Sequence, residues 1–94
     1  MLQREILRVL SVIARKGTLT VSRRRYHITG AMAYDLAEKV FGEQYSRSQW
    51  VSLNRALKSL ARLGHLRLFY VEAPSRSGII LRVLVASEWK TGHN

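Results

Sequence analysis

Apolar residues recur three or four positions apart in the first half of the chain and predict two amphipathic helices. Residues 2–16 form the first, and Gly17 is placed to end it in the left-handed conformation. Residues 29–41 form the second, with Thr29 as a capping residue and Gly42 as its end. The side chains expected to face the core are Leu2, Ile6, Val9, Leu10, Ile13, Met32, Leu36, Ala37, Val40 and Phe41.

A third helix has the clearest start in the chain. Ser46 is followed three residues later by Gln49, the spacing of a capping box, in which each side chain bonds to the backbone of the other residue. The helix is expected over residues 46–63, before Gly64. Its predicted inward side chains are Trp50, Leu53, Leu57, Leu60 and Ala61.

The remaining segments are rich in β-branched residues. Residues 18–28 carry three consecutive arginines and predict a short strand or an extended loop. Residues 65–87 contain two β-rich runs separated by a small polar stretch with Pro74 and Gly78, which predicts a hairpin. The sequence therefore predicts one α+β domain over residues 1–94, and residues 90–94 are expected to fray.

The charge of the chain indicates what kind of partner the domain binds. The 94 residues include 16 Lys and Arg against 6 Asp and Glu, a formal net charge of +10, which favours a polyanionic partner such as nucleic acid. The charge is concentrated: residues 1–28 carry +6 and residues 46–67 carry +5, with no acidic residue in the second segment.

The third helix combines small polar and basic residues on one side. Short hydroxyl side chains let the backbone approach phosphates, and arginine can bind a phosphate or a guanine edge. A solvated polar face is the alternative explanation, but such a face normally mixes both signs of charge. The stripe is Ser48, Ser52, Arg55, Ser59 and Arg62, flanked by Arg47, Gln49, Asn54 and Lys58. Arg76 in the hairpin loop, and Arg23 and Arg25, are the further candidate DNA contacts. The alternatives are an ordinary solvated turn at Arg76 and an exposed strand edge that Arg23 and Arg25 keep solvated.

The order of helix, extended segment, helix, helix, strand, loop and strand from Leu2 to Ser87 resembles the winged helix-turn-helix family. The most specific part is LNRALKSLARLGHL, residues 53–66, which looks like that family's recognition helix running into the first strand of the wing. The resemblance implies a third helix that enters the major groove of DNA and a wing that contacts an adjoining groove or the backbone. It implies a double-stranded DNA-binding protein, a small transcriptional or replication regulator, working as a homodimer on paired half-sites.

The same segment is also similar in part to the recognition helix of Z-nucleic-acid-binding winged helices, in which an Asn and a following Tyr meet the left-handed duplex. Asn54 and Arg55 fit that pattern. Lys58 stands at the position of the Tyr, and residues 73–78 replace that family's proline-rich wing and following Trp.

Other chemistry has little support in the sequence. There is no Cys, and His27, His65 and His93 are too scattered for a metal motif. No glycine-rich nucleotide loop is present, and no apolar run is long enough to cross a membrane. We expect a cytoplasmic protein that is not an enzyme and has no cofactor, metal or small-molecule ligand. Two alternative functions remain. One is binding to RNA or a ribonucleoprotein. The other is a protein-interaction module, in which the basic face docks on an acidic partner or the apolar hairpin extends another sheet.

Overall fold

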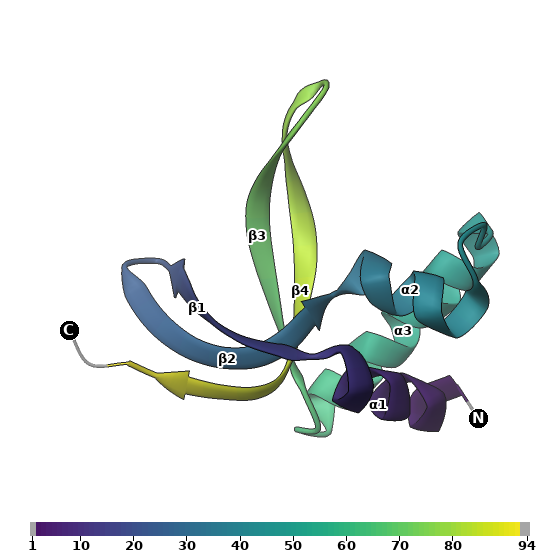
Figure 1. Cartoon of the computed structure of the whole chain (residues 1–94), viewed down its shortest axis with the longest axis horizontal. Coiled ribbons are helices and arrows are strands. Elements are labelled where there is room, and N and C mark those ends of the chain that lie inside the picture. Colours follow the sequence, from purple (N-terminus) through teal and green to yellow (C-terminus); the bar gives the residue numbers. More distant parts are fainter. Residues whose placement is uncertain (1, 93–94) are drawn as a thin grey trace.

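The computed structural model describes residues 2–92, which form three helices and one four-stranded sheet (Figure 1). The helices are α1 (Leu2–Ile13), α2 (Ala33–Phe41) and α3 (Arg47–Arg62). The strands are β1 (Arg15–Val21), β2 (Arg24–Met32), β3 (Arg67–Ser75) and β4 (Gly78–Thr91). All neighbouring strands are antiparallel, in the order β1-β2-β4-β3, so the predicted α+β class is confirmed.

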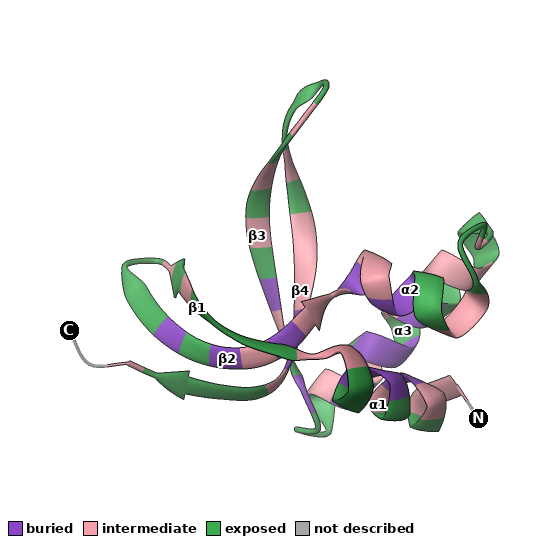
Figure 2. Cartoon of the chain, viewed as in Figure 1, coloured by how far each residue is buried: buried purple, intermediate pink, exposed green. Residues whose placement is uncertain are grey.

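The helices pack together over one face of the sheet. The predicted inward residues Ile6, Val9, Leu10, Leu36, Ala37, Leu53, Leu57 and Leu60 are all buried, and Leu66 and Val85 join them from the chain entering β3 and from β4. Leu2, Ile13, Met32, Val40, Phe41, Trp50 and Ala61 are partly buried. Figure 2 shows this buried surface where α1, α2 and α3 face one another and the sheet. The helical periodicity of the sequence therefore identified the main core correctly.

A second, smaller core lies on the other face of the sheet. It contains Tyr26, Ile28, Phe69 and Ala86. Val85 belongs to the main core and the next residue, Ala86, to the second core, because consecutive residues of a strand point to opposite faces of the sheet. The rings of Tyr26 and Phe69 are 5.1 Å apart although β4 separates their strands, so the sheet is bent around this cluster. The guanidinium of Arg67 covers both rings, at 5.0 and 4.6 Å from their centroids.

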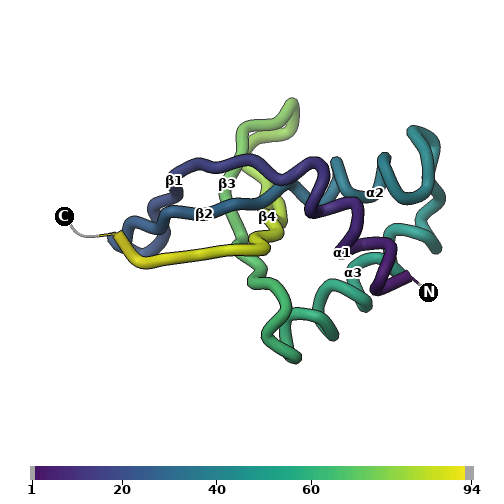
Figure 3. The backbone as a smooth tube through the Cα atoms, turned by 60° about the horizontal axis from the view of Figure 1, so that its bottom comes forward, coloured from purple at the N-terminus to yellow at the C-terminus, as the bar shows by residue number. Residues whose placement is uncertain are grey.

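The bend divides the sheet into two arms. β4 pairs with β3 through residues 78–86 and with β2 through residues 84–91, and the register with β2 shifts between Thr29 and Gly30. The β1–β2 hairpin with the end of β4 extends away from the helices, and the β3–β4 hairpin extends in another direction (Figures 1 and 3). We call the first the basic arm and the second the wing.

The first helix is shorter than its sequence predicts. It ends at Ile13 rather than at residue 16, and Arg15 to Gly17 already belong to β1. Each of these three residues is opposite a residue of β2, and Gly17 faces Ile28. The prediction that Gly17 ends the helix is wrong because strand pairing outweighs the local helical preference.

Residues 18–28 form most of a hairpin rather than one strand or a loop. β1 and β2 are joined by Ser22 and Arg23, whose φ angles are 51° and 66°. Two consecutive left-handed residues are the requirement of a type I′ turn, which normally uses Asn-Gly. Two residues with a Cβ therefore hold an unfavourable conformation at the tip of the basic arm.

The second helix also starts later than predicted. Thr29 lies in β2, between partners on β1 and β4, so it does not cap α2, which starts at Ala33. Gly42, with φ of 102°, ends the helix as expected. The last strand runs to Thr91 instead of residue 87; Lys90 and Thr91 do not fray but pair with β2, while residues 93–94 lie outside the described part.

The third helix follows the prediction closely, and so does the turn that leads from it into the hairpin. The amide of Gln49 donates to Ser46 Oγ at 3.1 Å, and the amide of Ser46 donates to Gln49 Oε1 at 2.8 Å, which completes the capping box. After Arg62 the chain turns through Gly64, whose φ is 84°, and enters the wing.

Candidate nucleic-acid interface

One side of α3 is open to solvent along the length of the helix. Its other side is held by Leu53, Ala56, Leu57 and Leu60, all buried against α1, α2 and the sheet. α3 lies behind α1 and α2 in Figure 1 and below them in Figure 3, so its outer side faces away from both helices. The candidate residues on this open side are Arg47, Ser48, Ser52, Arg55, Lys58 and Arg62, all exposed, and Ser59, half-buried. We call this surface the α3 face.

Two of the predicted contacts already have partners within the helix. The side-chain oxygen of Gln49 is used by the capping box, and Asn54 Nδ2 donates to the carbonyl of Trp50 at 2.8 Å. Trp50 itself is half-buried and stacks on Tyr45, with ring centroids 5.9 Å apart. These contacts stabilise the start of α3, and they leave the exposed arginines and serines as the freest groups of the α3 face.

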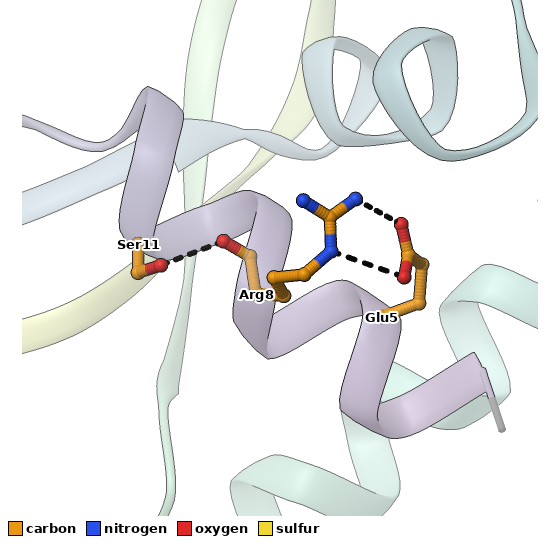
Figure 4. Close-up of polar contacts among 3 residues, drawn as sticks. All are labelled: Glu5, Arg8 and Ser11. Atoms are coloured by element: carbon orange, nitrogen blue, oxygen red, sulfur yellow. Dashed lines mark hydrogen bonds and ion pairs between the residues drawn. The ribbon is translucent and has the colours of Figure 1, made fainter.

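Among the described residues, no carboxylate forms an ion pair with a cation of the α3 face. Within residues 2–92, the ion pair between Arg8 and Glu5 on α1 is the only one (Figure 4). The hydrogen bond from Arg8 lowers the pKa of the Glu5 carboxyl. Arg47, Arg55 and Arg62 consequently present unpaired positive charge, which is the electrostatic requirement for binding phosphates.

The wing carries Arg76 at its tip. Its turn is held by Ser75, whose Oγ donates to the carbonyl of Gly78 at 2.9 Å, and by Gly78 itself, with φ of 117°. Nearer the base, the guanidinium of Arg82 lies 5.0 Å from the centre of the Tyr34 ring on α2. Sequence reasoning missed this contact because no local pattern relates α2 to β4.

Arg23 and Arg25 do not join the α3 face. The turn of the basic arm and the helices lie at opposite ends of the long axis, which measures 40 Å (Figure 1). Arg24 and Arg25 are opposite Val21 and Thr20 and so point to opposite sides of the arm, as expected for consecutive strand residues. The structure thus separates the predicted contacts into the α3 face, the wing tip and the basic arm.

The basic arm contains cations that the sequence did not single out. Lys16 and Lys90 lie on the same side of the sheet as Arg25, because the strand register places Lys16 opposite Thr29 and Lys90 opposite His27. Glu88 is the acidic residue on this side of the arm. These residues are distant in sequence, so only the pairing of β1, β2 and β4 could reveal their shared surface.

The described residues do not form a metal centre. No group of three His, Asp or Glu side chains between residues 2 and 92 is arranged to hold a metal ion, and His93 lies outside this range. None of the helices described is long and apolar enough to cross a membrane. Known protein families, curated proteins and solved structures give no match to this chain.

Proposed function

We propose that this protein binds double-stranded DNA, without catalysing a reaction, and reads the major groove with α3. The observation that carries the proposal is the α3 face: within the part of the chain that the structure describes, no other element covers this side of the helix, and its four cations have no ion-pair partner. No acidic residue occurs between residues 46 and 67, so nothing on the helix repels phosphate. An α-helix fits the major groove, where arginine can form paired hydrogen bonds with guanine.

The order of elements supports a winged-helix mode of binding. Three helices are followed by a hairpin, as in the winged helix-turn-helix family that the sequence resembles, and the hairpin tip offers Arg76 for a contact beside the major groove. β1 is an addition to that order, and with β2 and the end of β4 it forms the basic arm. Arg23 and Arg25 there contact phosphates outside the region that α3 reads.

The biological role proposed is a small regulator of transcription or replication, in the cytoplasm and associated with nucleic acid. A single helix reads few base pairs, so a homodimer on two half-sites would supply the necessary specificity. Sedimentation that finds only monomers at micromolar concentration, with and without DNA, would contradict the dimer.

Selection from a random duplex library at about 150 mM salt tests the proposal. The wild-type protein is expected to enrich a palindromic or repeated motif. Arg55→Ala should weaken the preference for the base it reads about fivefold to 150-fold, which corresponds to the 1–3 kcal/mol of a paired arginine–guanine contact. Lys39→Ala is the matched control, because it removes one exposed cation from α2, away from the α3 face.

Binding without an enriched motif, or an Arg55→Ala protein that keeps the full motif, would overturn reading by α3. Salt dependence gives a second criterion: about six to nine neutralised phosphates predict a slope of log affinity against log salt of about −5 to −8. Competition between duplex DNA and duplex RNA at equal ionic strength decides between the two polyanions, and stronger binding to RNA would replace this proposal by an RNA-binding one.

A further inference from the structure

The outer part of the wing has an apolar side that the rest of the described chain leaves exposed to solvent. Directly opposite residues of an antiparallel pair share one side of the sheet, so Tyr70, Leu81, Pro74 and Ile79 lie on a common side. Closer to the helices, this side continues into Val85 of the main core. Toward the tip it enters solvent: Tyr70 is 53%, Leu81 66% and Ile79 72% exposed.

Pro74 and Ile79 are the outermost members of this side. They are opposite each other, and the next pair, Ser75 and Gly78, closes the turn that carries Arg76. The wing projects beyond the rest of the molecule (Figure 1), so a partner can meet this pair before it meets the helices. An exposed apolar pair at a projecting tip gains free energy only when a partner removes it from water.

The surrounding charge restricts the chemistry of that partner. Residues 73–87 contain Arg76 and Arg82 and no acidic residue. Glu72 lies on the apolar side opposite Leu81, two residues closer to the base than Pro74. A polyanion is therefore favoured at the tip and disfavoured from Glu72 inward, which limits the apolar contact to the outer pair.

Duplex DNA satisfies both conditions. Its phosphates line the edges of the minor groove, and the faces of stacked bases offer apolar surface between them once a step is opened. Minor-groove proteins insert Pro, Ile or Leu between base pairs in this way and kink the duplex by roughly 20–90°. Pyrimidine–purine steps such as TA open at the lowest energetic cost.

We infer that Pro74 and Ile79 form an apolar wedge that enters the minor groove, partly unstacks a base step and bends the DNA. This inference rests on the proposed binding of double-stranded DNA and adds a way of binding to it. Arg76 at the turn contacts the phosphates beside the opened step, and the hydrogen bond from Ser75 to Gly78 keeps the tip in shape during entry. The protein accordingly selects deformable steps as well as base edges.

The test uses duplexes of about 30 base pairs with 2-aminopurine at a central TA step and a pair of dyes at the ends. Unstacking raises 2-aminopurine fluorescence, and bending raises energy transfer between the dyes. Wild-type protein is expected to raise both signals. Ile79→Ser should lose most of both signals while affinity falls about tenfold or less, because the lost apolar contact is offset by the unstacking that is no longer required.

Leu81→Ser is the matched control, since it removes an exposed apolar side chain from the same side of the same strand, at the level of Glu72. It should keep both signals. Both substitutions change exposed residues, and unchanged thermal unfolding will show that the fold is retained. Equal loss in the two variants, or full signals in Ile79→Ser, would overturn the wedge.

The outcomes also separate the wedge from the function on which it rests. A protein that binds the duplex without unstacking it refutes the wedge and leaves DNA binding intact, whereas a protein that binds no duplex refutes both. Vesicles containing phosphatidylserine test whether the wing tip binds a membrane, which is another polyanionic surface. If wild-type protein binds the vesicles without unstacking DNA, and Ile79→Ser does not bind them, the tip is a membrane-inserting element instead.

Discussion

Gly30 has no room for a side chain, and replacing it tests how β2 and β4 are held together. It lies just after the register shift in β2, paired with Ala86 on β4 and with Arg15 on β1. A Cβ built on Gly30 would be 2.3 Å from the carbonyl oxygen of Val85 and 3.0 Å from the Cα of Ala86. Both are backbone atoms, so no rotation of a side chain can relieve the overlap.

The cost of Gly30→Ala follows from the movement that it requires. The two strands must separate by about 0.7 Å or more to bring the closest contact to 3.0 Å. This movement weakens about two ladder hydrogen bonds, at roughly 1 kcal/mol each, and disturbs the packing of Val85 and Ala86 in the two cores at a cost of about 1–2 kcal/mol. We expect the free energy of unfolding to fall by about 3–4 kcal/mol and the melting temperature by about 12–30 °C.

Urea and thermal unfolding followed by circular dichroism would measure both quantities. Gly17→Ala is the control: Gly17 is also in the sheet, but no atom of residues 2–92 outside its own neighbours in the chain lies within 4 Å of the position that a Cβ would take there. That variant should stay within about 0.5–1 kcal/mol of the wild type, on the stabilising side. If the free energies of unfolding of Gly30→Ala and Gly17→Ala are equal, the close approach of β2 and β4 does not exclude a side chain at residue 30.

Two further substitutions examine the turn of the basic arm and the start of α3. Arg23→Gly should raise the free energy of unfolding by about 0.5–1 kcal/mol in urea titrations, because glycine tolerates the positive φ, while the salt slope of DNA binding becomes shallower by about 0.9. Arg24→Gly removes the same charge from a strand and should lower the free energy of unfolding instead. If both variants change this free energy in the same direction, Arg23 is not strained. Ser46→Ala should lower the free energy of unfolding by about 1 kcal/mol because the capping box is lost. The control Ser48→Ala, at an exposed position, should leave it almost unchanged. Equal free energies of unfolding for the two variants would show that the cap does not stabilise α3.

The sequence alone determined the features that depend on neighbours along the chain. Ser46 and Gln49 stabilise the start of α3 through bonds across three residues, and the apolar spacing around Leu53 and Leu57 follows from the turn of a helix. The positive charge and the absence of acidic residues in α3 are likewise visible in the order of residues itself. These features predicted the main core and the candidate residues on α3, and the β-branched runs of residues 18–28 and 65–87 predicted the α+β class.

The tertiary structure decided where local preference competes with pairing between strands. Residues 14–16 and 29–32 have helical patterns, yet Lys16 and Thr29 pair with each other, because joining two strands satisfies the hydrogen bonds of both at once. The same pairing decided which side of the basic arm Arg25 occupies, and it placed Ile79 opposite Pro74 at the wing tip.

The division between the two levels has one physical cause. A helix is specified by contacts three and four residues apart, so its face, its charge and its cap can be identified from a short segment. A sheet is specified by register between distant segments, and a shift of one residue moves every side chain to the other side. The main core, the α3 face and the hairpin of the wing therefore follow from the sequence, whereas the basic arm, the second core around Tyr26 and Phe69, and the exposed apolar pair of the wing exist only in the folded chain.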